Sequence, residues 1–196
     1  MNIAVVGLGN IGGPIARGLA AAGQPVIVAT SEPAKAEAFA TDAGSNVTPV
    51  ASVAAAVAQA EVIVFAVYAD AEKALSADPS NPIALDVDGT FTRSLPREEA
   101  VADTLSVLLP EGAHYVKAFG TLPAASLTSH RNTSPELTAL YYAPSDETGA
   151  SATEQVIRAA GFGPVRVNGD CAALRLEFGG NLVSLILTVS QARARL

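Results

Sequence analysis

The feature that most constrains the fold is a glycine-rich turn close to the beginning of the chain. Gly7-Leu8-Gly9-Asn10-Ile11-Gly12 follows a short apolar run at residues 2–6 and precedes residues 11–22, whose apolar side chains recur at helical spacing. The order strand, G-x-G-x-x-G turn, helix is typical of the first unit of a dinucleotide-binding fold. This placement makes a purely structural glycine turn the minor alternative.

Each glycine of the motif has its own task in such a fold. Gly7 permits the tight turn, Gly9 lets the backbone approach a pyrophosphate, and Gly12 lets the helix pack on the strand. Asn10 and Ile11 supply free backbone amides at the start of the helix, where phosphate charge is favoured. Residues 7–12, with Leu8 between the glycines, are therefore predicted to bind the cofactor.

Strand-like and helix-like segments alternate along the rest of the chain. The patterns predict strands at 25–29, 47–50, 61–67, 83–86, 114–118, 137–143 and 164–167, and helices at 32–40, 53–59, 71–77, 104–109 and 148–160. Turn-forming residues predict loops at 86–97 and 120–135. Residues 1–168 are therefore predicted to form an α/β domain, a Rossmann-type doubly wound parallel sheet.

The end of the chain has a different pattern. Leu174, Phe178, Leu182, Leu185 and Val189 are spaced by three or four residues, which predicts a long amphipathic helix within a C-terminal extension at residues 169–196. Such a helix either packs on its own domain or is covered by a second copy of the chain. We favour the second alternative and expect a homodimer that forms through this helix.

The residues after the second strand distinguish NADP from NAD. Thr30 and Ser31 stand where an NAD-binding protein has an acidic residue, and Lys35 follows one helical turn later. Hydroxyls and a cation suit a 2′-phosphate, so we predict NADP, bound as NADPH. Two alternatives remain: Ser31 is only a helix N-cap, and Glu32 binds a ribose or lies in the first turn of the helix.

Composition excludes several classes of partner. The net charge of −7, with no basic cluster, argues against nucleic acid and anionic membranes, and the chain has no run long enough to span a bilayer. The single Cys171 excludes an internal disulfide, and the beginning of the chain lacks the features of a signal peptide. We expect a cytoplasmic protein with a small-molecule partner.

Two local patterns suggest other chemistry and are interpreted differently. Asp86 and Asp88 lie in D-x-D-G-T, a pattern of phosphatases with an aspartate nucleophile, but it follows a fifth strand rather than a first one. We therefore assign Asp86 to the lining of the cofactor cleft. His114 and His130 have no partners at metal-ligand spacing, so no metal site is predicted.

A second motif gives the chain a family resemblance. The segment from Lys117 to Ala125, KAFGTLPAA, resembles the K-A-F-N-T-x-P-A stretch of the coenzyme F-420-dependent NADP oxidoreductase family. The resemblance implies that Ala66, Val67 and Tyr68 lie near the nicotinamide ribose. It also implies that Gly120 and Thr121 contact the cofactor, and that Leu122 and Pro123 face the substrate.

The resemblance further implies direct hydride exchange between NADPH and a flat acceptor, such as coenzyme F-420 or a flavin, without a catalytic acid or base. The predicted function is therefore an NADP-dependent oxidoreductase with a small redox acceptor. The alternatives are a non-catalytic NAD(P)-binding sensor or partner module, and an imine or ferric-chelate reductase. Loops rather than the fold determine the acceptor, so the sequence does not identify it.

Overall fold

The structure is a computed structural model, and it describes residues 1–67, 83–86, 109, 112–169, 171–177 and 179–196. The predicted helices at 71–77 and 104–109, and most of the loop at 86–97, lie outside these residues. Among the described residues, no helix is long and apolar enough to cross a membrane.

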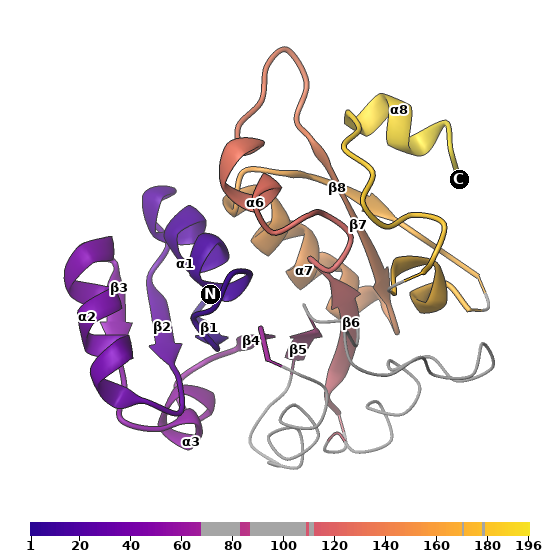
Figure 1. Ribbon diagram of the computed structural model, residues 1–196. Coiled ribbons are helices and arrows are strands. Elements are labelled where there is room, and N and C mark those ends of the chain that lie inside the picture. Colours follow the sequence, from indigo (N-terminus) through magenta and orange to yellow (C-terminus); the bar gives the residue numbers. More distant parts are fainter. Residues whose placement is uncertain (68–82, 87–108, 110–111, 170, 178) are drawn as a thin grey trace.

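One mixed sheet forms the centre of the molecule (Figure 1). Its strands follow the order β3-β2-β1-β4-β5-β6-β7-β8. Their bounds are β1 (Ile3–Val6), β2 (Val26–Ala29), β3 (Val47–Pro49), β4 (Val62–Phe65), β5 (Ile83–Asp86), β6 (His114–Ala118), β7 (Ala139–Pro144) and β8 (Gly163–Arg166). All eight agree with the predicted strands to within about two residues at each end, the usual disagreement between assignments of an element's end.

The first six strands are parallel, and their order 3-2-1-4-5-6 is that of the Rossmann fold, so the predicted fold class is confirmed. The register pairs Val6 with both Ala29 and Phe65, then Phe65 with Asp86 and Asp86 with Lys117. The segments that follow β1, β2, β4, β5 and β6 therefore leave the sheet along one edge. The strand order reverses between β1 and β4, where a dinucleotide binds in such sheets.

The last two strands differ from the predicted all-parallel arrangement. β7 runs antiparallel to β6, with Ala118 opposite Tyr142, and β8 is parallel to β7. An antiparallel neighbour needs no crossover to the opposite edge of the sheet, so residues 119–138 stay at the carboxyl edge of β6. This segment was predicted as loop, and it contains the short helix α6 (Ser126–Ser129).

Helices cover both faces of the sheet. One face carries α1 (Gly12–Ala21), α2 (Pro33–Ala43), α6 and α7 (Glu147–Ala159), which form one apolar core with the side chains of alternate strand residues. The opposite face carries α3 (Val53–Val57) over β1 and β4, and the C-terminal segment over β7 and β8. β1 and β4 are buried along their whole length, as expected for central parallel strands.

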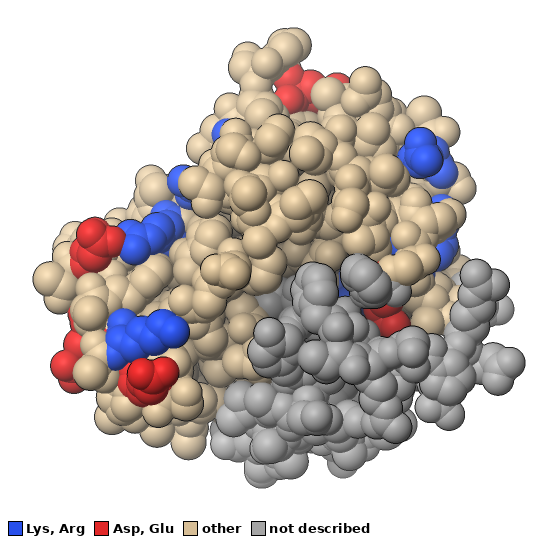
Figure 2. Space-filling view, viewed as in Figure 1, with Lys and Arg blue, Asp and Glu red and all other residues tan. Residues whose placement is uncertain are grey.

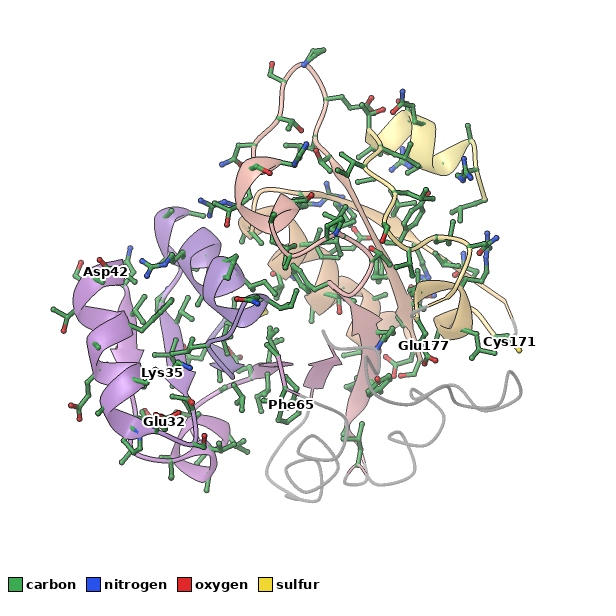
Figure 3. The ribbon with its side chains drawn as sticks, in the orientation of Figure 1. Glu32, Lys35, Asp42, Phe65, Cys171 and Glu177 are labelled. Carbon is green, nitrogen blue, oxygen red and sulfur yellow. The ribbon has the colours of Figure 1, made fainter. Side chains whose placement is uncertain are left out.

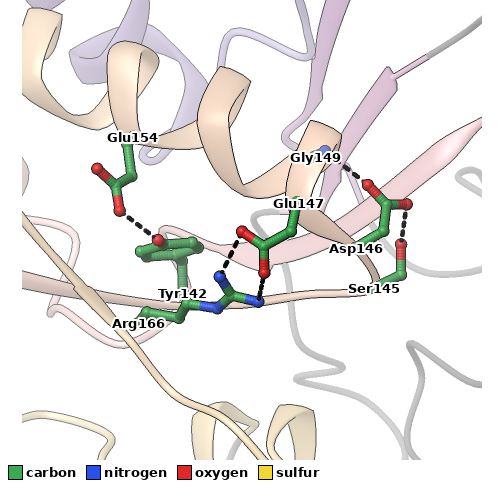
Figure 4. A network of polar contacts seen from close by, with 7 residues as sticks. All are labelled: Tyr142, Ser145, Asp146, Glu147, Gly149, Glu154 and Arg166. Atoms are coloured by element: carbon green, nitrogen blue, oxygen red, sulfur yellow. Dashed lines mark hydrogen bonds and ion pairs between the residues drawn. The ribbon is translucent and has the colours of Figure 1, made fainter.

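Polar contacts fasten α7 to the sheet (Figure 4). The Tyr142 hydroxyl donates to Glu154 over 2.6 Å, and Arg166 holds Glu147 through two nitrogens, at 2.9 and 2.7 Å. Burial, followed by the bond to Glu154, raises the pKa of Tyr142, so its hydroxyl remains a donor at any ordinary pH. These contacts fix α7 against β7 and β8, on the same face of the sheet as α1.

The long C-terminal helix is a wrong prediction. The chain forms the 3-10 helix η1 (Ala173–Leu176), a series of turns, and the short helix α8 (Val189–Arg193). Leu176 and Leu182 are buried against β7 and β8, and Leu185 and Val189 pack beside them. Most of the predicted apolar stripe therefore covers the chain's own sheet.

Candidate functional site

The glycine turn forms the predicted connection between β1 and α1. The Gly7 N–H donates to Ala29 O over 2.9 Å, and the Gly13 N–H donates to Gly9 O over 3.1 Å. Gly7 has φ +92°, a conformation that side-chain-bearing residues rarely adopt. The turn is thus tied to β2 on one side and runs directly into the helix on the other.

The three motif glycines differ in what a side chain would meet there. A Cβ on Gly12 would collide with the Gly7 carbonyl oxygen, and one on Gly7 would collide with the Ala66 carbonyl oxygen. A Cβ on Gly9 would have no atom within 4 Å. Gly7 and Gly12 are therefore required by packing within the fold, whereas the space beside Gly9 is open to a ligand.

The N-terminus of α1 has the features of an anion site. The N-cap residue is Ile11, whose side chain makes no capping hydrogen bond, and the first turn carries no acidic residue. Gly9 and Asn10 are exposed at this end of the helix. The first amides of a helix have no intrahelical acceptor, so a phosphate beside Gly9 can accept from them. The residues present therefore fit a dinucleotide pyrophosphate.

The predicted 2′-phosphate residues lie beyond the end of β2. Thr30 is half-buried, whereas Ser31 and Lys35 are exposed, and Figure 3 shows Lys35 and Glu32 near each other at the N-terminal end of α2. The N-cap of α2 is Glu32 and not Ser31, and the first turn of α2 contains no acidic residue. The alternatives that made Ser31 the N-cap and placed Glu32 in the first turn are therefore wrong, and the Ser31 hydroxyl is exposed.

The predicted nicotinamide contacts begin after β4. The Ala66 N–H donates to Val6 O over 2.8 Å, and a Cβ on Gly7 would come within 2.9 Å of Val67. Ala66 and Val67 therefore lie directly beside the glycine turn. Tyr68 lies outside the described residues. Asp86 ends β5 in register with Phe65 of β4 and Lys117 of β6, which places its backbone at the same edge.

The KAFGTLPAA segment leaves β6 through a sharp turn. The Gly120 N–H donates to Ala118 O over 2.9 Å, and Phe119 between them is fully buried with φ +62°. This is the hydrogen-bond pattern of a γ-turn in its rarer, strained form. Strained backbone that is held by its surroundings is most common at functional sites.

Thr121 follows this turn and is the most unusual polar group at the sheet edge. It is 2% exposed, and its hydroxyl has no hydrogen-bond partner among the described residues. Its carbonyl accepts from the Ser184 N–H over 2.7 Å, which joins the C-terminal segment to this loop. Leu122 is buried and Pro123 is exposed, so only one of the two predicted substrate contacts faces solvent.

Two charged residues, Lys117 and Glu177, are buried on one face of the sheet next to this loop. Lys117 is fully buried and, by strand alternation, faces away from the core that contains Val116 and Ala118. Glu177, which is 6% exposed, follows η1 on that same face (Figure 3). The burial of Glu177 could not be predicted from the sequence, because a helical interpretation of this region gives no indication that an acidic residue is buried.

A pocket of about 690 Å³ lies beside the glycine turn, between α1, α2 and α6. One wall contains Gly9 and Asn10, and the opposite wall contains Ala124, Ala125 and Thr128. The post-β6 segment and the glycine turn, which are over 100 residues apart in the sequence, therefore meet at one site. This pocket could not be predicted from the sequence, because no motif marks α6.

Comparison with known proteins gives a family match for part of the chain and a fold for nearly all of it. Residues 2–83 match the model of the family described as NADP oxidoreductase, coenzyme F420-dependent. A search of curated proteins gives no match. Among solved structures, the hypothetical protein SMa0349 from Sinorhizobium meliloti is 30% identical with a TM-score of 0.82, over 96% of this chain and 95% of that one.

Two further structures are similar in fold. A putative F420-dependent NADP-reductase from Arthrobacter sp. FB24 is 18% identical with a TM-score of 0.69, over 95% of this chain and 98% of that one. An imine reductase from Aspergillus terreus in complex with NADPH4 is 22% identical with a TM-score of 0.65, over 88% of this chain and 56% of that one. Residues 2–83, which include the glycine turn, therefore match the NADP oxidoreductase, coenzyme F420-dependent family, and the chain as a whole shares the fold of these solved structures.

Proposed function

We propose that the chain binds NADPH along the carboxyl edge of the sheet and transfers hydride to a small redox acceptor, a deazaflavin such as coenzyme F420 or a flavin. The observation that carries this proposal is the open space at the glycine turn, beside the N-terminus of α1. Gly9 leaves open space beside an α1 N-terminus that no side chain of the described residues caps, so the pyrophosphate would accept from the amides there.

The end of β2 supports NADPH over NADH. The exposed Ser31 hydroxyl and Lys35 ammonium would bind the 2′-phosphate, with Thr30 beside them. The carboxylate of Glu32 lies close by and would repel that phosphate, so Lys35 has to offset it. The preference for NADPH therefore depends on Lys35.

The reaction would rely on orientation rather than on acid or base chemistry. NADPH supplies the hydride, and Ala66 and Val67 on one side and Gly120 to Pro123 on the other would hold its nicotinamide against the acceptor. None of these residues, and none of the glycine turn, has a titratable side chain. Their contribution is to position the two rings and exclude water between them. Tyr68 and Asp86 remain predicted cofactor contacts.

The same lack of titratable groups favours a second candidate, a non-catalytic NADPH-binding module. Turnover separates the two. Purified protein with NADPH is mixed in turn with coenzyme F420, FMN and a ferric chelate, and loss of the nicotinamide absorbance is followed. Oxidation by one of these acceptors, reduced by Gly9→Ala but not by Arg158→Gln, supports the enzyme. Binding without oxidation by any acceptor would favour the module instead.

We also propose that the chain is a cytoplasmic homodimer. Ile186 is 47% exposed within the apolar run 182–189, and a second copy would cover it. The exposed free thiol of Cys171 suits a reducing compartment. Sedimentation velocity at micromolar concentration should give about twice the chain mass of 19.8 kDa, and Ile186→Glu should shift the species toward the monomer. A wild-type monomer would contradict the dimer.

A further inference from the structure

We propose that the pocket between α1, α2 and α6 binds the anionic side chain of the redox acceptor, and that Arg17 recognises its phosphate or carboxylate group. The inference rests on the proposed function, since it concerns the acceptor of that same reaction. It names the part of the acceptor that sets specificity, and it assigns a role to a residue outside the glycine motif.

The pocket begins at the glycine turn and extends along the outer side of α1. Leu8, Gly9 and Asn10 line its end at the turn. Gly13, Pro14 and Arg17 line the part along α1, where their spacing places them on one side of the helix. The sheet-facing side of α1 carries other residues, among them the buried Leu19. A cofactor held by the first amides of α1 and by the strand ends would occupy the end of the pocket at Gly9 and Asn10, and would leave the part at Gly13, Pro14 and Arg17 free.

The opposite wall connects the pocket to the predicted acceptor contacts. Ala124 and Ala125 line the pocket, and they follow directly after Leu122 and Pro123 in the chain. A ring that stacks near Leu122 and Pro123 would therefore have this pocket beside it as the path for its side chain. The volume of about 690 Å³ lies within the range of small-molecule sites.

The charge of the pocket indicates what it would bind. The Arg17 guanidinium lies 4.6 Å from the centre of the Phe39 ring, and its Nη2 is 2.6 Å from Asp42 Oδ2. Both partners belong to α2, so they hold a side chain that is still 44% exposed at the pocket wall. A guanidinium has five N–H donors, and those turned away from Asp42 can bind an oxyanion in a fork. Because the ring already orders this arginine, less entropy is lost when it binds.

The remaining lining residues add little competing polarity. Pro14, Ala124 and Ala125 are small and apolar, and Thr128 adds a hydroxyl. The chain as a whole carries a net charge of −7, but Arg17 is the one charged residue among the described residues that line the pocket. Figure 2 shows basic and acidic side chains side by side on the part of the surface that contains α2. Because Asp42 is paired with Arg17, it competes with an incoming anion for Arg17.

Two pairs of acceptors test this inference, because the members of each pair share a ring and differ in charge. FMN is compared with riboflavin, and coenzyme F420 with its uncharged deazariboflavin core, at saturating NADPH. We expect kcat/KM to favour the anionic member of the productive pair about tenfold, a difference of about 1.4 kcal/mol. Arg17→Gln should bring the ratio close to one by lowering kcat/KM for the anionic member only. Asp42→Asn should raise the ratio, since it frees the guanidinium.

Controls separate this inference from the proposed function. Arg158→Gln removes an exposed arginine that is paired with Glu154 on α7, away from the pocket, and should leave the ratio unchanged. Turnover with a ratio that Arg17→Gln does not change would overturn the inference and leave the proposed function intact. A raised KM for NADPH in Arg17→Gln would also overturn it, because Arg17 would then serve the cofactor. No turnover with any of the four acceptors would overturn both.

Discussion

At the scale of single residues, the three glycines of the turn are required for different reasons. Gly7 takes a left-handed conformation, Gly12 lies against the Gly7 carbonyl, and Gly9 faces open space. The first two constraints come from packing between β1, β4 and α1. Nothing among the described residues requires a glycine at position 9. A pyrophosphate bound in the open space beside Gly9 would explain why a glycine is there.

Alanine substitutions should therefore separate folding from binding. Gly9→Ala should leave the melting temperature unchanged but weaken NADPH binding at least tenfold, or about 1.4 kcal/mol, because its Cβ occupies the space of the phosphate. Gly12→Ala should lower the melting temperature, because backbone atoms block its Cβ. Gly13→Ala is the matched control, since its Cβ would make only contacts of 3.6 Å or longer. Equal NADPH affinity in Gly9→Ala and wild type would contradict this division.

Asp146 gives a prediction about pH. Burial would raise the pKa of Asp146, but the bonds from the Gly149 N–H, His114 and Ser145 outweigh it and lower that pKa. A carboxyl group whose folded-state pKa is lowered stabilises the fold above its unfolded pKa of about 3.9, and loses this effect as the pH falls through the folded value.

Melting temperatures of wild type and Asp146→Asn, measured from pH 7 down to pH 3, test this assignment. Asparagine still caps a helix, so the variant removes the charge and keeps the cap. Wild type should melt higher near neutral pH, and the difference should shrink below about pH 4. A difference that stays constant across this range would show that the charge of Asp146 does not contribute.

At the scale of elements, buried parallel strands were the easiest to predict. β1 and β4 are continuous apolar runs because both of their faces are covered, and β6 and α7 have clear patterns of their own. The reversal at β7 could not be predicted, since strand direction depends on pairing across the sheet. The γ-turn at Phe119 was also unforeseen, because phenylalanine carries no signal for a positive φ.

The C-terminal segment shows why the spacing of apolar residues wrongly predicted a long helix. Apolar residues three or four apart predict a helix, but Gly179 and Ser184 have positive φ, and Gly180 packs against the backbone of Arg175. The chain therefore turns repeatedly while it keeps its leucines over β7 and β8. An irregular segment that covers a sheet face can thus carry the same apolar spacing as a helix.

Of the candidate site, the glycine turn could be predicted from the sequence, whereas the pocket that Arg17 lines could not.

Alanine substitution at two positions of this segment tests the corrected structure. Leu182 is 1% exposed and Ile186 is 47% exposed. Leu182→Ala should lower the free energy of unfolding by about 2–5 kcal/mol, the usual cost of removing a buried leucine side chain. Ile186→Ala should change it by less than about 0.5 kcal/mol if measured on the monomer. Equal losses from both substitutions in urea unfolding would contradict the observed packing.

At the scale of the whole molecule, the fold brings distant segments to one edge. The glycine turn, the end of β4 and the segment after β6 meet there because five parallel strands end in register and β7 returns without a crossover. The Ser184–Thr121 hydrogen bond adds the C-terminal segment to the same region. Cofactor and acceptor would therefore share an edge that four separate parts of the chain build.

The most direct test of this account is a titration of the purified protein with NADPH and with NADH, followed by nicotinamide fluorescence. We expect NADPH to bind at least tenfold more tightly than NADH, a difference of at least about 1.4 kcal/mol, and Lys35→Gln to reduce that ratio. Equal affinities for NADPH and NADH would show that Thr30, Ser31 and Lys35 do not bind a 2′-phosphate. If neither nucleotide binds, the glycine turn is structural only and the central claim is wrong.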